Sequence, residues 1–230
     1  MQVDIILEPD LTPAQVAEIA VAAENYGFRT LWHSNYHQNP DAFVGLVPAA
    51  LATRKIKLGV LAVSPYEMHP LKIANALLTL NEISNGRAIA AIGGGGSVMS
   101  AIGIKMDPKA QRMLRSVREA VEMVKAVTSG KFVQGYPGEL FKLTRPLKSG
   151  WAKSPKPGVF TCSTGPKMLE MAGKIADGTQ MSDVTPEKIG HHMAHLRAGL
   201  AARTTPAEDF RIGNFWAWHI KADREKSMYE

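Results

Sequence analysis

The chain has 230 residues with 45% hydrophobic side chains, a single cysteine and a formal net charge of +6. This length can bury a sizeable core, whereas no apolar run reaches the ~18 residues that a membrane span requires. Basic residues are scattered rather than clustered, and the lone Cys162 excludes an intrachain disulfide, so we expect a cytoplasmic protein that binds neither nucleic acid nor a membrane.

The N-terminal part of the chain alternates apolar runs with helical patterns. Thr12 and Gln15 have the spacing of a capping box, and Pro70 stands where the first turn of a helix needs no backbone N–H. Asn85 and Gly86 are typical of a helix end. These patterns predict strands over 3–7, 28–32, 56–63 and 88–92, with helices over 12–26, 43–52 and 70–84 between them.

The C-terminal part continues this alternation after one interruption. Four glycines at 93–96 follow the fourth strand, where bare backbone can approach a ligand closely. The segment 129–156 is rich in Gly, Pro and Lys, and we interpret it as an excursion with a small hairpin that covers one end of the domain. The remaining patterns predict helices over 108–128, 166–176 and 186–203, and strands over 159–163, 179–182 and 212–220.

Strands that alternate with helices indicate parallel pairing through right-handed crossovers. Seven such strands fit either a closed (β/α)₈ barrel or an open doubly wound sheet. A complete barrel takes ~250 residues, so this chain would be one β/α unit short of it. An unclosed barrel exposes an edge at its first and seventh strands, which favours pairing with another chain, and we expect a homo-oligomer such as a dimer.

Four motifs occur in order along nearly the whole chain: NYGFRTLW at 25–32, IKLG at 56–59 with SPYEMHP at 64–70, TLNEISNGR at 79–87, and GPKML at 165–169 with ADG at 176–178. In these motifs the chain resembles the luciferase-like monooxygenase superfamily, and within it the coenzyme F420-dependent methylene-tetrahydromethanopterin reductases. The resemblance implies one α/β domain over 1–230, a TIM (β/α)₈-type barrel truncated before the eighth β/α unit. It also implies a cofactor at the C-terminal ends of the strands.

The resemblance implies an oxidoreductase that transfers a hydride between a reduced deazaflavin, coenzyme F420, and a small organic substrate, with the cofactor supplying the difficult chemistry. Residues 101–104, AIGI, resemble the deazaflavin-dependent group more than the flavin-dependent group. Two alternatives remain, namely an FMN-dependent monooxygenase and a truncated or non-catalytic flavin-binding member.

Cofactor-binding residues are expected in three loops. The resemblance implies a bulge beneath the cofactor ring, with a cis peptide bond between Leu61 and Ala62, and a glycine loop beside the cofactor's side chain. Exposed N–H groups between the fifth strand and the next helix would suit a phosphate. An ordinary strand end, a glycine turn and a capped turn are the alternatives. The residues expected at the cofactor are Leu61, Ala62, Val63, Gly93, Gly94, Gly95, Ser163, Thr164, Gly165 and Lys167.

Catalytic candidates follow the first two strands. Glu8 ends the first strand, where a carboxylate could face the substrate. After the second strand, Asn35 stands where the family carries an acid and Tyr36 where it carries a histidine. Asparagine can hydrogen-bond a ring but cannot act as a general base. His33 and His37 could compensate, so the catalytic candidates are Glu8, His33, Asn35 and His37.

Metal chemistry is not expected. His191, His192 and His195 lie close together in the sequence, and the first and last of them share a helical face. No glutamate occupies the metalloprotease position and no third ligand is evident, so the pattern favours a solvated helix face.

Overall fold

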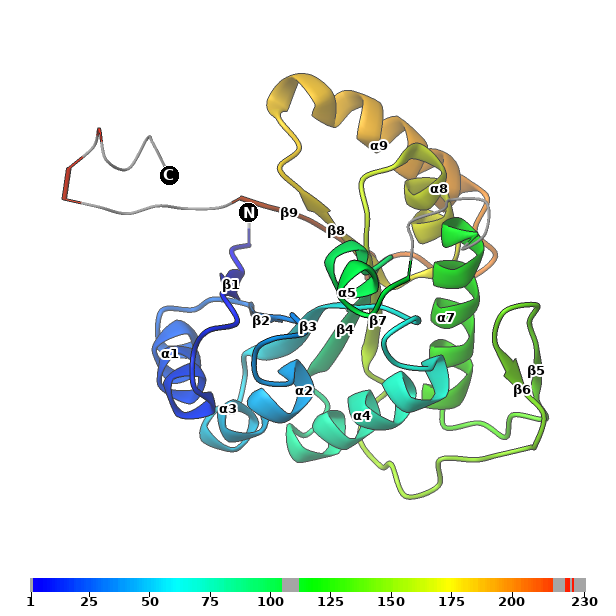
Figure 1. The fold of residues 1–230 in the computed structure, drawn as a ribbon, viewed down its shortest axis with the longest axis horizontal. Coiled ribbons are helices and arrows are strands. Elements are labelled where there is room, and N and C mark those ends of the chain that lie inside the picture. Colours follow the sequence, from blue (N-terminus) through cyan, green and yellow to red (C-terminus); the bar gives the residue numbers. More distant parts are fainter. Residues whose placement is uncertain (1, 105–111, 217–221, 224, 226–230) are drawn as a thin grey trace.

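The computed structural model describes residues 2–104, 112–216, 222–223 and 225. Seven parallel strands form one sheet in the order β1-β2-β3-β4-β7-β8-β9, which curls into an open half-barrel of the TIM-barrel type (Figure 1). The expectation of a parallel α/β fold is therefore confirmed. The strands are β1 (Ile5–Leu7), β2 (Thr30–Ser34), β3 (Lys57–Val63), β4 (Ala88–Ile92), β7 (Gly158–Cys162), β8 (Gly178–Ser182) and β9 (Arg211–Phe215).

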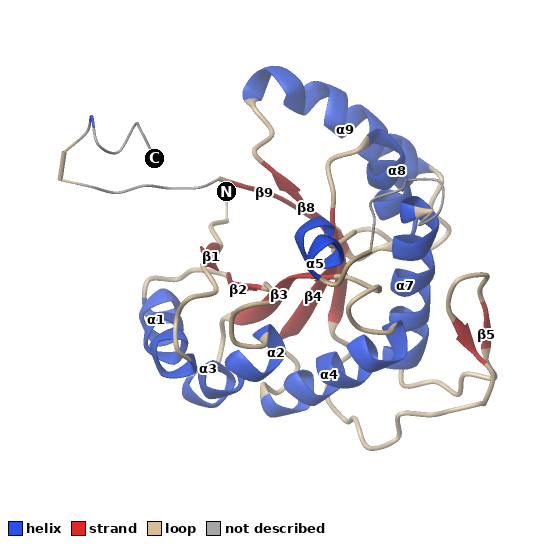
Figure 2. Ribbon diagram, in the orientation of Figure 1, coloured by secondary structure: helices blue, strands red, loops and turns tan. Residues whose placement is uncertain are grey.

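Helices cover the convex side of the sheet, as Figure 2 shows. The capping box of the first helix is present, because Thr12 N donates to Gln15 Oε1 at 2.9 Å and Gln15 N donates to Thr12 Oγ1 at 3.3 Å. No described helix is both long and apolar enough to cross a membrane. The helices are α1 (Pro13–Asn25), α2 (Ala42–Gly45), α3 (Val47–Ala52), α4 (Pro70–Ile83), α5 (Gly96–Ala101), α7 (Met113–Thr128), α8 (Pro166–Ile175) and α9 (Pro186–Ala201).

The sheet has a core on each face. On the convex face, side chains such as Leu58 and Val60 pack against helices, and on the concave face Trp32, Leu61 and Phe160 belong to a smaller cluster. Strands buried on both faces need apolar residues at consecutive positions, which explains why the strand sequences run apolar without alternation.

The predicted elements and the structure differ in several places. The helix expected over 43–52 is two helices, α2 and α3, because Pro48 lacks the N–H that would continue the ladder. The short helix α5 follows the glycines without a sequence signal that predicted it. The helix expected from Pro108 begins at Met113, and residues 105–111 and 217–221, which the predictions included in a helix and a strand, lie outside the described residues.

The segment 129–156 contains a small hairpin of β5 (Tyr136–Pro137) and β6 (Lys142–Leu143). Its tip is held on α7 by Glu119, which is 2% exposed and accepts hydrogen bonds from the backbone N–H groups of residues 139–141. Near its end, Ser154 N donates to Glu82 on α4 at 2.7 Å. The segment therefore runs along the outside of α4 and α7, and it reaches the strand-end rim at Phe141, whose ring centroid lies 6.3 Å from that of Tyr66 and 5.6 Å from that of His69.

Arg87 joins the start of β4 to the ends of two helices from inside the protein. Its guanidinium, 6% exposed, donates to the carbonyls of Ala50 and Ile56 at 2.8 Å and to that of Ser84 at 2.7 Å. Removing a buried charged donor leaves several carbonyls without partners.

We expect Arg87→Met to lower the free energy of unfolding by about 3 kcal/mol, because it breaks this buried network. Urea denaturation followed by circular dichroism measures the change. The control is Arg118→Met on the exposed face of α7, where Arg118 lies 4.0 Å from Glu122 and a surface pair is worth about 0.5 kcal/mol. Equal losses in the two variants would contradict this role of Arg87.

Candidate functional site

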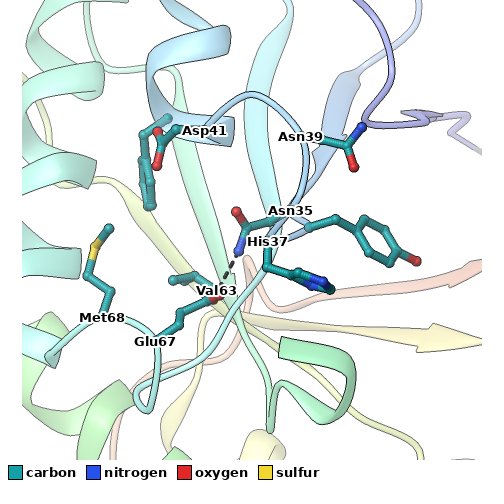
Figure 3. Close-up of a pocket in the computed structure, with 9 residues that line it drawn as sticks. Asn35, His37, Asn39, Asp41, Val63, Glu67 and Met68 are labelled. Atoms are coloured by element: carbon teal, nitrogen blue, oxygen red, sulfur yellow. Dashed lines mark hydrogen bonds between the residues drawn. The ribbon is translucent and has the colours of Figure 1, made fainter. Parts of the chain in front are cut away.

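A cleft of about 260 Å³ lies where β2 and β3 end. Parallel strands place all their C-terminal ends at one rim, so the loops that follow them meet there. Figure 3 shows the side chains of this cleft converging from the loop after β2 and the loop after β3. The cleft is lined by Asn35, Tyr36, His37, Asn39, Asp41, Phe43, Val63, Glu67 and Met68.

An amide and a carboxyl group are joined at the centre of the cleft. Asn35 Nδ2 donates to Glu67 Oε1 at 2.9 Å, the bond that Figure 3 marks with a dashed line. It also donates to the carbonyl of Ala62 at 3.1 Å. Ser64 N donates to the same Oε1 at 2.5 Å. Oε1 thus has two donors, whereas Oε2 makes no hydrogen bond to the described residues. The carboxyl group is therefore fixed by one oxygen and offers the other to the cleft.

The pKa of Glu67 is raised above its ordinary value. Burial is the largest cause, and the nearby carboxylate of Asp41 adds to it. The hydrogen bonds from Ser64 and Asn35, and the charge of His37, act in the opposite direction and are outweighed. A carboxyl group with a raised pKa keeps its proton to higher pH, so it can serve as a proton donor.

Two small side chains and a glycine pack together where β3, β4 and β7 end. The peptide bond between Leu61 and Ala62 is cis, as the resemblance implied, and Gly93 N donates to the carbonyl of Val63 at 3.0 Å. A Cβ at Gly93 would lie 3.3 Å from that of Ala62 and 3.6 Å from that of Cys162. The ends of β3, β4 and β7 therefore form one continuous layer, which we call the strand-end floor: Ala62, Gly93 and Cys162.

Cys162 contributes a neutral side chain to the strand-end floor. Burial raises the pKa of its thiol to about 11, so at neutral pH it is not a thiolate nucleophile. Cys162 therefore serves as a small packed side chain in this layer.

The next glycines pack against the chain itself. A Cβ at Gly94 would lie 2.6 Å from Met113 Sδ, and one at Gly95 would overlap Ser64. Gly95 also has φ of +74°, which favours glycine. Close packing and the positive φ thus explain why glycine stands at Gly95, whereas at Gly94 the flexible Met113 side chain could move aside and at Gly96 the Cβ direction is open.

The loop between β7 and α8 presents backbone donors. Gly165 is the N-cap of α8 and provides no side-chain cap, so N–H groups of the first turn have no intrahelical partner. Ser163 and Thr164 are half-buried beside it, and Lys167 is exposed on the first turn. Binding of a phosphate by these residues therefore stays a prediction.

The four catalytic candidates separate in the structure. Asn35 and His37 line the cleft. His33 is fully buried beneath α2, where Nδ1 donates to the Ser34 carbonyl at 2.7 Å and Nε2 has no partner but lies close to Gly45. Glu8 is exposed at the end of β1, outside the residues that line the cleft. The structure therefore does not bring His33 or Glu8 to the cleft.

Glu67 is the candidate that the sequence did not single out. It lies inside the SPYEMHP motif, but a glutamate in a loop is ordinarily solvated. Only the approach of two loops gives Glu67 its amide partner. On α9, His195 pairs with Glu170 at 2.7 Å, and the described residues contain no cluster that could hold a metal ion.

Comparisons with known proteins match nearly the whole chain to one family. The family model described as luciferase-like monooxygenase matches residues 2–229. The chain is 33% identical to a 5,10-methylenetetrahydromethanopterin reductase of Archaeoglobus fulgidus, over 99% of this chain and 67% of that protein. It is 31% identical to an F420-dependent glucose-6-phosphate dehydrogenase of Kineococcus radiotolerans, over 72% of this chain and 51% of that protein. The chain spans about two thirds of the reductases it matches.

Solved structures show the same fold. The coenzyme F420-dependent tetrahydromethanopterin reductase from Methanopyrus kandleri matches with a TM-score of 0.79 and 26% identity, over 99% of this chain and 69% of that one. An F420-dependent secondary alcohol dehydrogenase matches with a TM-score of 0.83 over 99% of this chain and 72% of that one, at 18% identity, which speaks for the fold alone.

The raised pKa of Glu67 predicts how the free energy of unfolding depends on pH. The folded state binds the proton more tightly than the unfolded state, so stability falls as pH rises from the ordinary carboxyl pKa through the raised one. Glu67→Gln keeps an acceptor for Asn35 and Ser64 but does not titrate. We expect a flatter dependence of the unfolding free energy on pH above about 4.5.

The matched control for this measurement is Glu8→Gln, which changes an exposed carboxylate outside the cleft. Denaturation curves between acid and neutral pH compare the variants. If Glu67→Gln retains the pH dependence of the unchanged protein, the assignment of that dependence to Glu67 is wrong.

Proposed function

This chain belongs to the luciferase-like monooxygenase family, and we propose that it is an oxidoreductase that transfers a hydride between coenzyme F420 and a small organic substrate. The observation that carries the proposal is the combination of the strand-end floor with a cleft carboxyl group, Glu67, whose pKa is raised. The F420-dependent reductases and dehydrogenases among its relatives support the choice of coenzyme.

The residues at the rim fit a planar ring with an anionic side chain. Ala62, Gly93 and Cys162 offer a floor without charge or bulk, on which an aromatic ring can stack. The open first turn of α8 and the ammonium of Lys167 offer donors to a phosphate. Under this proposal, Leu61–Val63 lie beneath the ring and Ser163–Gly165 hold the phosphate.

Under this proposal, side chains of this chain donate the proton that accompanies the hydride. A bound deazaflavin supplies or accepts the hydride. Reduction of a carbonyl or imine group also needs a proton on its oxygen or nitrogen, and Glu67, which lines the cleft and has a raised pKa, would supply it. Asn35 is then a positioning residue, because its amide fixes Oε1 and leaves Oε2 free. The lost proton is replaced from solvent, since Glu67 is half-buried rather than sealed.

Titration of the purified chain with coenzyme F420 and with FMN, followed by fluorescence, tests the choice of cofactor. We expect saturable binding of the deazaflavin and weaker binding of FMN. Preference for FMN would favour the monooxygenase alternative, and binding of neither would favour a non-catalytic member.

The phosphate seat has its own test. We expect Lys167→Met to weaken coenzyme F420 binding about ten-fold, because it removes a charge-assisted contact. Lys174→Met, which alters an exposed lysine in the last turn of the same helix, is the control and should bind as before. Identical affinities for both variants would remove Lys167 from the site.

The role of Glu67 is tested by turnover. We expect Glu67→Gln to lower the rate of substrate reduction about a hundred-fold, the usual loss for a general acid, with coenzyme affinity unchanged. Single-turnover absorbance of the deazaflavin with a panel of small ketones and imines measures it. A variant that binds the coenzyme and turns over normally would show that Glu67 is not the proton donor.

A further inference from the structure

The hairpin of β5 and β6 contacts the loop that carries Glu67. Phe141 stands directly before β6, and its ring meets Tyr66 and His69 with interplanar angles of 64° and 85°. Aromatic rings attract one another in this edge-to-face arrangement. Tyr66 and His69 stand on either side of Glu67 in the sequence, so Phe141 supports both flanks of the carboxyl group in the cleft.

The tip of the hairpin is fixed on α7 by a buried carboxylate. Glu119 accepts hydrogen bonds of 3.1, 2.9 and 3.1 Å from the consecutive N–H groups of residues 139–141. Near the next turn of α7, Glu122 Oε2 accepts from Tyr136 OH at 2.6 Å. Figure 1 shows the hairpin on the outer side of α7. The backbone of Phe141 is therefore placed by α7, and its ring reaches from there to the rim.

Gly138 allows the tip to come this close to Glu119. A Cβ at Gly138 would lie 2.6 Å from Glu119 Oε2 and would overlap the carbonyl oxygen of Phe141. Because neither a buried carboxylate nor the backbone of the turn can move aside cheaply, a side chain at Gly138 would shift the tip. The position of Phe141 thus depends on close packing that begins at α7.

The loop 64–69 is tied to the protein at both of its ends. At the first end, the hydroxyl of Ser64 donates to the carbonyl of Gly94 at 3.1 Å. At the second end, His69 Nδ1 accepts from Leu71 N at 3.2 Å and caps α4. Glu67 lies between these ends and is half-buried. The ring of Phe141 adds support from the outer side of the loop.

Phe141 acts on Glu67 without charge. Burial raises the pKa of Glu67, and the hydrogen bonds from Ser64 and Asn35 lower it. The charged groups that act on this pKa are Asp41, which raises it, and His37, which lowers it, and both belong to the segment between β2 and α2. A phenyl ring carries no charge, so it affects Glu67 through burial and through the position of the loop.

We propose that Phe141 is a positioning residue, which holds the loop 64–69 so that the carboxyl group of Glu67 stays buried in the cleft. This inference rests on the proposed function, in which that carboxyl group donates the proton. Glu119 acts one step further back, because it fixes the backbone of Phe141. A loop that moved outward would expose the carboxyl group to water, and Glu67 would then lose its proton at lower pH.

Titration of Glu67 itself tests the proposal without any cofactor. NMR of protein labelled with ¹³C in its glutamate carboxyl groups follows each group against pH, and the signal that Glu67→Gln removes belongs to Glu67. We expect Phe141→Ala to move the midpoint of this signal down toward the ordinary value of 4.5. Phe141→Tyr keeps the ring and should leave the midpoint in place.

The matched control is Phe132→Ala, which removes an aromatic ring that is 61% exposed in the same segment. It should leave the midpoint of Glu67 unchanged. Circular dichroism checks folding, and Gly138→Ala, which shifts the tip but keeps every ring, takes the place of Phe141→Ala if that variant unfolds. A midpoint that stays in place in the folded variant overturns the proposal, and so does an equal shift in Phe132→Ala.

Turnover separates this proposal from the proposed function. With coenzyme F420 and a small ketone, we expect Phe141→Ala to lower kcat about ten-fold with coenzyme affinity unchanged, and Phe141→Tyr to keep the original rate. If the midpoint of Glu67 moves while kcat does not, Phe141 still positions Glu67, and it is the role of Glu67 as proton donor that fails. If kcat falls without a shift of the midpoint, the positioning of Glu67 by Phe141 is wrong.

Discussion

The packing of Trp32 on the concave face is the contact on which the curl of the sheet depends. Its indole is 1% exposed, lies 5.7 Å from the ring of Phe160, and donates from Nε1 to Asp4. A Cβ at Gly59 would overlap the same ring, so β3 can approach β2 closely only with glycine there. One side chain therefore touches β2, β3 and β7 and the segment before β1. The strands that it draws together are those whose loops form the cleft and the strand-end floor.

Under the proposed function, the arrangement at the rim would supply an acid from a loop other than the one after β2. Asn35 cannot take a proton, but its amide bridges the carbonyl of Ala62 and the carboxyl of Glu67. The titrating group is thereby moved from the second strand to the loop after the third. Burial then raises the pKa of Glu67, which favours its protonated form in the cleft.

Local pattern was enough to predict the strands, the helix that begins at Pro70, and the parallel order, because each depends on nearby residues and on crossover handedness. Pro48 indicates the break between α2 and α3, but it lies in an apolar run that also fits one continuous helix. The residues of the candidate site were harder to predict from the sequence than the fold. His33 looked catalytic after β2, yet strand alternation turns it toward α2, and Glu67 matters only through a contact across 32 residues of sequence.

Under the proposed function, the groups that would face a coenzyme come from one side of the sheet, at the ends of β2, β3, β4 and β7. The residues that line the cleft come from the loops after β2 and β3 and the start of α2, and β8 and β9 contribute none of them. Because parallel strands all end at the same rim, loops from neighbouring strands can build such a site without a residue from the far side of the sheet.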